Sequence, residues 1–159
     1  MMSLNSQNSL LNGWVTEISI DAPRQVVWNQ LTDFAAYRQW NPFVLEAKAT
    51  FKVGSTIRFL ENLEEFGQHW ITAKFIAIQA PEEFVWQGYV YAPFLFNVRH
   101  GFQLESIDAD RTRFVHSHRH TGLLLPYLCD RGIFQRSYEG YVAFNRALKQ
   151  LCESLPKQC

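Results

Sequence analysis

The sequence predicts an α+β domain in which a curved antiparallel sheet of about seven strands wraps around a long C-terminal helix. Three observations lead to this prediction: a first strand followed by two short helices, six consecutive β-rich runs with short connections, and an amphipathic run near the C-terminus. The 159 residues are 47% hydrophobic, which suits one well-buried core. We therefore predict a single domain over 1–159, with its core over about 14–155.

The first three elements have clear local signals. Residues 14–20 alternate well enough for a strand, and a helix is predicted over 23–31, with Asp21 as the capping carboxylate and a proline in the first turn. Asp33 can cap a second short helix. That helix should end just before Pro42, because the residue that precedes a proline disfavours helical geometry.

Short β-rich runs separated by turn residues fill the middle of the chain. Consecutive strands with short connections favour an antiparallel meander. The last segment places apolar side chains at steps of three, four and seven, which is typical of an amphipathic helix long enough to cross a sheet. The predicted strands cover 44–50, 56–63, 70–79, 84–90, 96–106 and 112–121, and the predicted helix covers 134–155.

Composition excludes several function classes. Fifteen basic residues balance fifteen acidic ones with no long basic run, so nucleic acid is not an expected partner. The sequence has neither the pattern of a secretion signal nor a stretch that could span a bilayer, so we expect a cytoplasmic protein without integral membrane association. It also contains no Gly-rich phosphate loop and no nucleophile elbow, so we expect no cofactor.

Several short motifs follow one another in a specific order. They read Ile20-Asp21-Ala22-Pro23, Leu31-Thr32-Asp33-Phe34, Trp40-Asn41-Pro42-Phe43, Phe84-Val85-Trp86-Gln87-Gly88, His100-Gly101-Phe102, Thr112-Arg113-Phe114 and Gly122-Leu123-Leu124. In this order, over roughly residues 14–153, they resemble the START and birch-pollen-allergen superfamily, also called SRPBCC. The resemblance is strongest to its polyketide cyclase/dehydrase-like bacterial branch.

This resemblance implies a helix-grip fold, a deep pocket between the sheet and the C-terminal helix, and a hydrophobic ligand such as a lipid, sterol or polyketide. It does not imply a reaction, because the superfamily includes carriers, receptors and cyclases. The last strand departs from the family pattern. An acidic residue followed by an aromatic is common there, whereas this chain has His118 and His120, so a carboxylate role at this position is not carried over.

Histidines alternate along the last predicted strand. His116, His118 and His120 share one face because side chains two residues apart point the same way, whereas the opposite face carries two arginines, which prefer water. The three imidazoles should therefore face the helix. His100 lies on the apolar face of the preceding strand, so we expect it to approach one of them across the ladder.

This histidine cluster is open to several interpretations. Neutral imidazoles can hydrogen-bond a ligand, and His100 or His118 can act as a general base. A set such as His100, His118 and His120 can also hold zinc, although we expect no metal. The alternative without function is that these are partly buried sheet residues satisfied by water and one another, or that the last ones lie at an exposed strand end.

Aromatic and polar side chains complete the predicted lining, although the aromatic ones can instead simply pack in the core. Trp86 is the best candidate for an apolar wall, because Gly88 on the same face leaves room for a ligand or for neighbouring backbone. Asn145 falls on the apolar stripe of the helix, where its amide needs a partner. Glu61 is expected in a solvated hairpin with two further glutamates. The ligand-binding candidates are Trp40, Phe84, Trp86, His100, Phe102, His116, His118, His120, Tyr138, Tyr141 and Asn145.

Three functional hypotheses follow. The one we favour is a binding protein for a hydrophobic or amphipathic small molecule, such as a lipid, polyketide or aromatic compound, held between the sheet and the helix. The second is an enzyme of cyclase, dehydratase or isomerase type that uses a pocket histidine and no nucleotide cofactor. The third is a regulatory or dimerising interaction module, and a homodimer is a possible assembly.

Overall fold

A seven-stranded antiparallel sheet dominates the computed structural model, which describes residues 10–156. The strands are β1 (Gly13–Ile20), β2 (Val44–Ala49), β3 (Thr56–Leu63), β4 (Gly67–Gln79), β5 (Glu83–Val90), β6 (Phe96–Ser106) and β7 (Thr112–Thr121). Their order in the sheet is β1-β7-β6-β5-β4-β3-β2, so the predicted meander runs from β2 to β7 and β1 pairs with the last strand.

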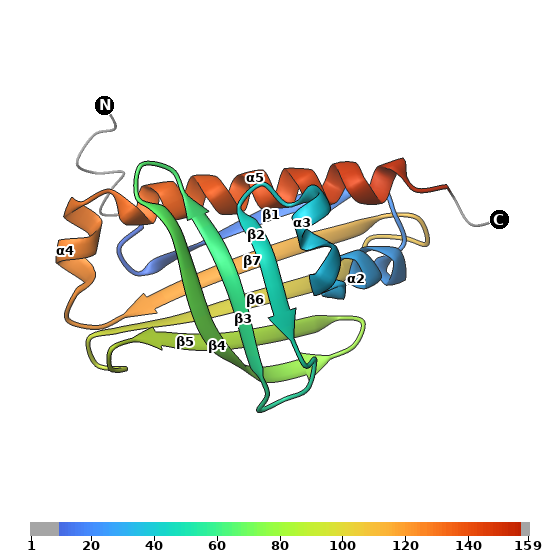
Figure 1. Ribbon diagram of the computed structural model, residues 1–159. Coiled ribbons are helices and arrows are strands. Elements are labelled where there is room, and N and C mark those ends of the chain that lie inside the picture. Colours follow the sequence, from blue (N-terminus) through green and yellow to red (C-terminus); the bar gives the residue numbers. More distant parts are fainter. Residues whose placement is uncertain (1–9, 157–159) are drawn as a thin grey trace.

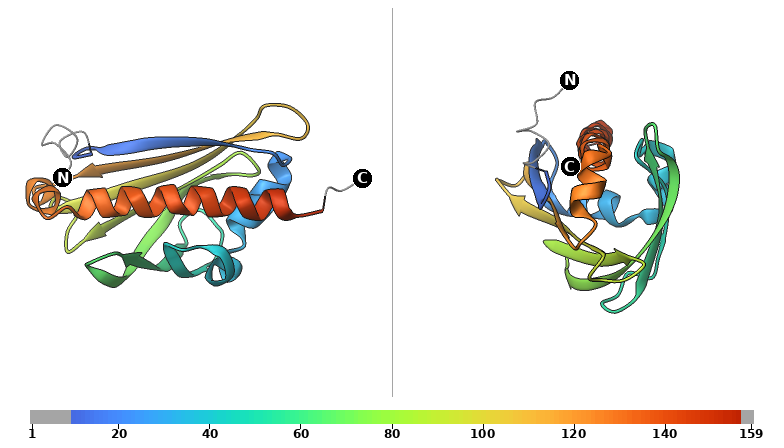
Figure 2. Two further views of the ribbon diagram at one scale, coloured as in Figure 1. Left: turned by 90° about the horizontal axis from the view of Figure 1, so that it is seen from above. Right: turned by 90° about the vertical axis from the view of Figure 1, so that its left-hand side faces the viewer.

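One long helix lies along the concave face of this sheet. In Figure 1 the helix runs alongside β1 and across the direction of β2 and β3, and the end-on view in Figure 2 shows the sheet curving around it on both sides. The predicted α+β helix-grip fold is therefore confirmed. The helical segments are α2 (Arg24–Thr32), the 3₁₀ turn η1 (Phe34–Ala36), α3 (Tyr37–Trp40), α4 (Leu125–Asp130) and α5 (Ile133–Ser154).

Side-chain caps explain one predicted helix start and not the other. Asp33 accepts a hydrogen bond from the Ala36 amide at 3.3 Å, as expected, although the second helix is divided into η1 and α3. Asp21 does not cap α2, which has no side-chain cap. Its backbone N–H instead donates to the Glu153 carboxylate at 2.8 Å, and this bond ties the end of α5 to the turn after β1.

Pro42 ends α3 as the sequence predicts. The preceding Asn41 has an extended backbone, with ψ of 116°. Its buried side-chain oxygen accepts hydrogen bonds from the backbone amides of Phe43 at 3.0 Å and Val44 at 2.8 Å. The chain is thereby directed from the short helices into β2.

Two elements differ from the prediction. The helix α4 was not predicted, because six residues are too few to display a helical period. The strand β4 begins at Gly67 rather than at residue 70, because its first three residues, which are exposed, pair with the end of β3. Backbone hydrogen bonds to β3 stabilise this extension, so the sequence shows no apolar alternation that would predict it.

The core fills the space between the sheet and α5. Phe75, Phe84 and Phe114 from the strands and Tyr141 and Phe144 from α5 are among the largest fully buried side chains. No helix within residues 10–156 is both long and apolar enough to cross a bilayer. The buried residues of α5 follow the predicted steps of three, four and seven, and they are Phe134, Ser137, Tyr141, Phe144, Asn145, Leu148 and Cys152.

Candidate ligand site between the sheet and the C-terminal helix

Four histidines from β6 and β7 are buried in the concave face of the sheet, as the alternation predicted. His100, His116 and His120 are no more than 2% exposed and His118 is 8% exposed. His120 is thus not at an exposed strand end, and its ring stacks on Phe134 at 4.2 Å between ring centroids. The assignment of the two faces of β7 is also confirmed, because Arg113 and Arg119, on the opposite face, are exposed.

His100 and His118 form the contact expected across the ladder. They are directly paired in the register of β6 and β7, and His100 Nε2 lies 2.5 Å from His118 Nδ1. Burial holds the pKa of each ring well below its usual value, with further lowering from the neighbouring imidazoles, so both rings are neutral at pH 7. The outer nitrogens, His100 Nδ1 and His118 Nε2, have no hydrogen-bond partner among residues 10–156.

The hydrogen bonds that the His100–His118 pair can offer a ligand are the same in either tautomer. A neutral imidazole carries one N–H and one lone pair, and the shared hydrogen bond uses one of each. The two remaining nitrogens therefore always consist of one donor and one acceptor. The pair can meet a ligand hydroxyl, which both donates and accepts, and its donor can meet a carbonyl oxygen.

A hydrogen-bonded chain fixes the orientation of His116. The Thr16 hydroxyl donates to the His116 carbonyl at 3.4 Å and accepts from Asn145 Nδ2 at 2.8 Å. The Asn145 oxygen is then left to accept from His116 Nδ1 at 2.8 Å. His116 is consequently protonated on Nδ1, and its Nε2 lone pair is buried without a partner in the described chain. Burial lowers the pKa of His116 to about 4, against a smaller opposing effect of Asn145.

Glu61 belongs to the site, which the sequence analysis missed. It was expected in a solvated hairpin, but its side chain points inward, is 8% exposed and accepts a hydrogen bond from the Tyr141 hydroxyl. Burial raises its pKa to about 7, although the bond from Tyr141 acts in the opposite direction. The signal that could have found it is the alternation of Ile57, Phe59 and Glu61, which places all three on the buried face of β3.

Aromatic rings pack between these polar groups. Phe84 stacks on Phe102 at 4.5 Å, and the Trp86 ring lies 4.4 Å from the His100 ring, so the predicted walls adjoin the imidazoles. Trp40 instead packs against Tyr37 and Phe144 and helps to seal the core.

Tyr138 packs at the edge of the core. It is partly buried and contacts Trp14 edge to face, with ring centroids 5.8 Å apart.

Gly88 leaves no room for a ligand, because a Cβ there would lie 3.0 Å from the Thr72 carbonyl oxygen. The backbone of β4 fills that space, which was the second of the two alternatives.

The interior cavity is much smaller than the resemblance implied. Its volume is about 20 Å³, and Phe34, Phe59, Phe102 and Tyr141 are among its walls. Pockets for small ligands usually measure roughly 300–1,000 Å³. The deep open pocket is therefore not present in this conformation, because aromatic side chains fill it.

Metal binding finds no geometric support in the described part of the chain. The four imidazoles contact one another in a chain, with ring centroids 3.9–5.0 Å apart. Residues 10–156 contain no group of three or more His, Cys, Asp or Glu side chains that could hold an ion. The chemistry that the cluster offers is hydrogen bonding and proton transfer by neutral groups.

Comparisons with known proteins agree with the fold. The model of a family described as polyketide cyclase / dehydrase and lipid transport matches residues 14–150. No curated protein shows a significant match to the sequence. The Zhui aromatase/cyclase from Streptomyces sp. R1128 has a TM-score of 0.73 at 18% identity, over 89% of this chain and 93% of that chain. A START superfamily protein from Mycobacterium smegmatis has a TM-score of 0.72 at 14% identity, over 91% and 99%. At these identities, the likeness establishes the shared fold.

Proposed function

The chain belongs to the polyketide cyclase / dehydrase and lipid transport family, and we propose that it binds a flat, apolar small molecule carrying a hydroxyl or carbonyl group between the sheet and α5. One observation supports this proposal above the others. His100, His116 and His118 each keep a buried ring nitrogen without a hydrogen-bond partner in the described chain, in the middle of an aromatic interior. Each such atom costs roughly 1–3 kcal/mol, and a ligand oxygen recovers that cost.

The surrounding rings define the ligand's shape. The ring centroids of Trp86, Phe102 and Tyr141 each lie 4.4 Å from that of a histidine. A ligand that reaches the imidazoles displaces these aromatic contacts, so a flat ring in the ligand would replace them best. The small cavity requires that aromatic side chains move to admit it. Affinity then comes from apolar burial at about 25 cal/mol per Å², less the cost of that movement.

Paired probes test the proposal by calorimetric titration. We expect saturable binding of 2-naphthol that is at least tenfold tighter than that of naphthalene, which lacks the hydroxyl. His116→Leu should reduce this difference, because it removes the acceptor nitrogen. Equal affinity for the two probes, or no saturable binding of either, would refute the proposed site. We also propose that the protein is cytoplasmic, which cell fractionation tests.

Glu61 supports a second candidate function, acid–base catalysis on the bound molecule. A carboxyl with a pKa of about 7 can both take and return a proton at neutral pH. It accepts a hydrogen bond from Tyr141, whose ring centroid lies 4.4 Å from that of His100. Enolisation of a bicyclic ketone is the simplest reaction of this kind: the base takes a proton from the carbon next to the carbonyl and returns one from solvent.

Deuterium exchange measures that step directly. The protein in D₂O should accelerate exchange into 2-tetralone above the rate in buffer, and Glu61→Gln should abolish the acceleration while 2-naphthol binding is retained. Glu64→Gln is the matched control, because Glu64 is an exposed carboxylate in the adjoining hairpin. If the wild type gives no acceleration, the binding function stands without catalysis.

A further inference from the structure

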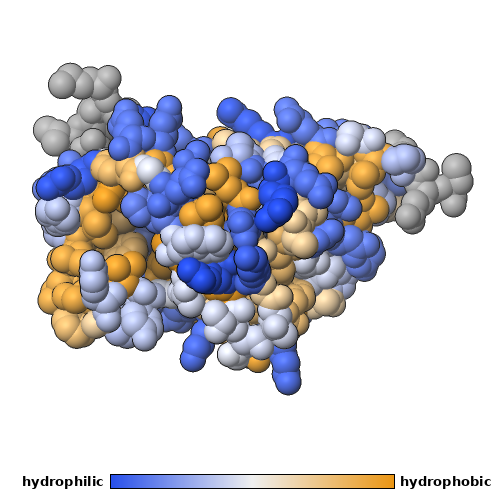
Figure 3. All heavy atoms as spheres, in the orientation of Figure 1, coloured by the Kyte–Doolittle hydropathy of each residue, from blue (hydrophilic) through white to orange (hydrophobic). Residues whose placement is uncertain are grey.

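Exposed apolar side chains gather at one end of the molecule. Two connections form this end: the loop between β5 and β6, and the segment from Gly122 through α4. Six of the eleven exposed large hydrophobic residues of the described chain lie there or at the adjoining end of β5. Figure 3 shows the same concentration of hydrophobic residues over α4 and the neighbouring loop, at the left-hand end of the view. We call Tyr91, Phe94, Leu123 and Tyr127 the apolar tip; they are 88%, 66%, 75% and 55% exposed.

Backbone hydrogen bonds join the two connections into one surface. The amides of Leu123 and Leu124 donate to the carbonyls of Phe94 and Leu95 at 3.0 and 2.9 Å. Gly122 permits this approach, because its φ is 133° and a Cβ would lie 2.3 Å from the Leu95 carbonyl oxygen. The tip is therefore a defined surface, held in place by its own backbone.

Tyr91 is held outward in a strained conformation. Its φ is 63°, which is unusual for a bulky residue, and the Ala92 amide donates to the Val90 carbonyl across it at 2.8 Å. This turn places an aromatic ring almost wholly in solvent. Strained backbone of this kind is concentrated at functional positions.

Charge is absent from the tip and positive around it. Residues 89–98 and 121–129 contain no Asp, Glu, Lys or Arg, although charged residues make up 19% of the chain. Arg131 lies over the Tyr127 ring, 5.0 Å from its centroid. Arg99 and Arg119 are directly paired across β6 and β7 on the outer face, within three residues of the strand ends that meet the tip.

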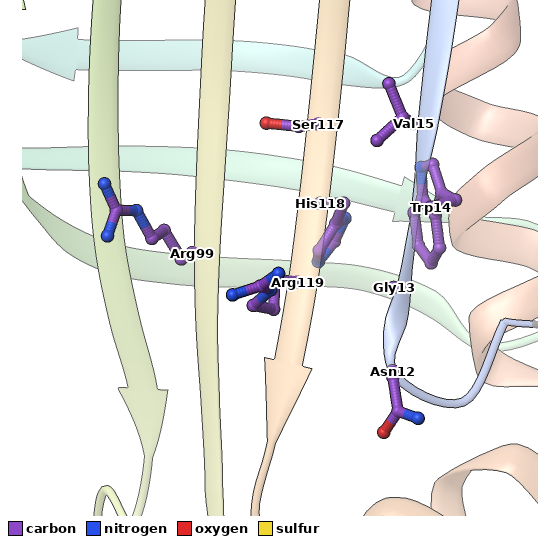
Figure 4. Close-up of a pocket in the computed structure, with 8 residues that line it drawn as sticks. All are labelled: Asn12, Gly13, Trp14, Val15, Arg99, Ser117, His118 and Arg119. Carbon is purple, nitrogen blue, oxygen red and sulfur yellow. The ribbon is translucent and has the colours of Figure 1, made fainter.

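The pair of Arg99 and Arg119 lines an open groove. The groove has a volume of about 360 Å³ and runs over the outer face beside Gly13 and Val15 of β1. In Figure 4 both arginine side chains extend from their strands over this face in the same direction. Like charges directly opposite each other destabilise a sheet, and neither arginine forms an ion pair within residues 10–156. An external anion would relieve that repulsion.

We propose that this end of the molecule docks on the surface of an anionic lipid bilayer. The tyrosines, Phe94 and Leu123 enter the headgroup region, where amphipathic aromatic rings are favoured, and Arg99, Arg119 and Arg131 contact lipid phosphates. A bilayer fits better than a second protein, because the tip combines loop aromatics with a basic surround and offers no acidic group except Asp130. The association is peripheral, and the side chains proposed to contact the bilayer are not those of the proposed ligand site.

Cosedimentation with vesicles tests this proposal. The wild type should associate with phosphatidylcholine vesicles that contain phosphatidylglycerol, and the association should weaken as salt rises. Combined Phe94→Asp and Leu123→Asp should weaken it at least tenfold. Arg99→Gln and Arg119→Gln should each weaken it about fivefold on anionic vesicles and have no effect on pure phosphatidylcholine.

Two variants control for apolar exposure and for charge. Ile107→Asp changes an exposed residue in the hairpin at the opposite end of β6 and β7. Arg113→Gln removes one charge from the same face of β7, at an arginine already paired with Glu17 and Glu105. Both should bind vesicles like the wild type, and equal losses in the controls would overturn the proposal.

Two other outcomes also contradict bilayer docking. The first is a dimer in size-exclusion chromatography that Leu123→Asp dissociates, together with no vesicle binding. That result would assign the apolar tip to contact with a second copy of the chain. Arginine-dependent binding of inorganic phosphate without vesicle binding assigns the groove to a free anion. Circular dichroism of each variant establishes that it is folded, so a loss of binding reports on the surface.

Discussion

The ionisable side chains of the interior share one main cause for their shifted pKa values, which is burial. Burial lowers the pKa of His116 and of His120 to about 4 and raises that of Glu61 to about 7. A core selected only for stability would use apolar residues at these positions, because they avoid the desolvation cost. We expect the proposed ligand site to offset this cost.

Glu61 gives the first prediction, on the pH dependence of stability. Its folded pKa of about 7 lies above the unfolded value of 4.5, so its contribution is complete below pH 4.5 and is lost as pH rises through 7. The free energy of unfolding of the wild type, minus that of Glu61→Gln, should fall by about 3 kcal/mol over this window. Urea denaturation at a series of pH values measures it. A difference that is flat with pH would show that Glu61 is not buried.

Asn145 gives the second prediction, on the protonation of His116. Asn145→Asp places a carboxylate at the atom that now lies 2.8 Å from His116 Nδ1, and a negative charge there favours the imidazolium. An NMR titration should show the pKa of His116 rising from about 4 by one to three units. The pKa of His120, which does not contact Asn145, should stay where it is. An unchanged His116 would contradict the assigned hydrogen-bond chain.

At the residue scale, the sequence predicted the site where a side chain's direction follows from strand alternation. That rule placed all four buried histidines correctly. It applied equally to Glu61, but three glutamates close to a turn were interpreted as a solvated loop. The bond that holds Glu61 comes from Tyr141, eighty positions away, and no local pattern reveals such a partner.

At the element scale, α5 is the structure that closes the site. Its buried face carries both Tyr141 and Asn145, and so it brings partners to Glu61 and His116 from the same helix. Gly140 lets the helix approach β2, because a Cβ there would lie 2.1 Å from the Phe43 ring. Phe43 in turn packs edge to face on Tyr141, with ring centroids 4.7 Å apart.

Gly140→Ala gives the third prediction. Alanine is the better helix former by about 1 kcal/mol, yet we expect a net destabilisation of roughly 1–3 kcal/mol from the clash with Phe43. Urea denaturation measures the loss. Adding Phe43→Leu should recover part of it, because the smaller side chain makes room, and an interaction energy near zero in this double-mutant cycle would contradict the close packing.

Element prediction succeeded where a period or a punctuating residue was present. The period of α5 and the proline after α3 gave their positions directly. The helix α4 has only six residues and no side-chain cap, so the proline in its first turn is a start signal without a helical period to support it. Its position depends on the backbone bonds that Leu123 and Leu124 make to the β5–β6 loop.

At the scale of the whole molecule, the fold was predictable and the state of its interior was not. Strand order follows from short connections between consecutive strands, and the wrapped sheet follows from that order together with one long amphipathic helix. Whether a helix-grip interior is open or filled depends on the joint packing of many rings, such as Phe34, Phe84 and Phe102. Sequence patterns do not contain that information.

The most direct test of the ligand site is a side-chain ¹⁵N NMR spectrum of the histidines, recorded with and without saturating 2-naphthol. We expect the Nε2 resonance of His116 to shift strongly and those of the His100 and His118 pair to shift with it. His69, which is exposed and hydrogen-bonds the Phe66 carbonyl, should not change. Unchanged His116, His100 and His118 resonances at saturation would contradict a ligand site in the core of this protein.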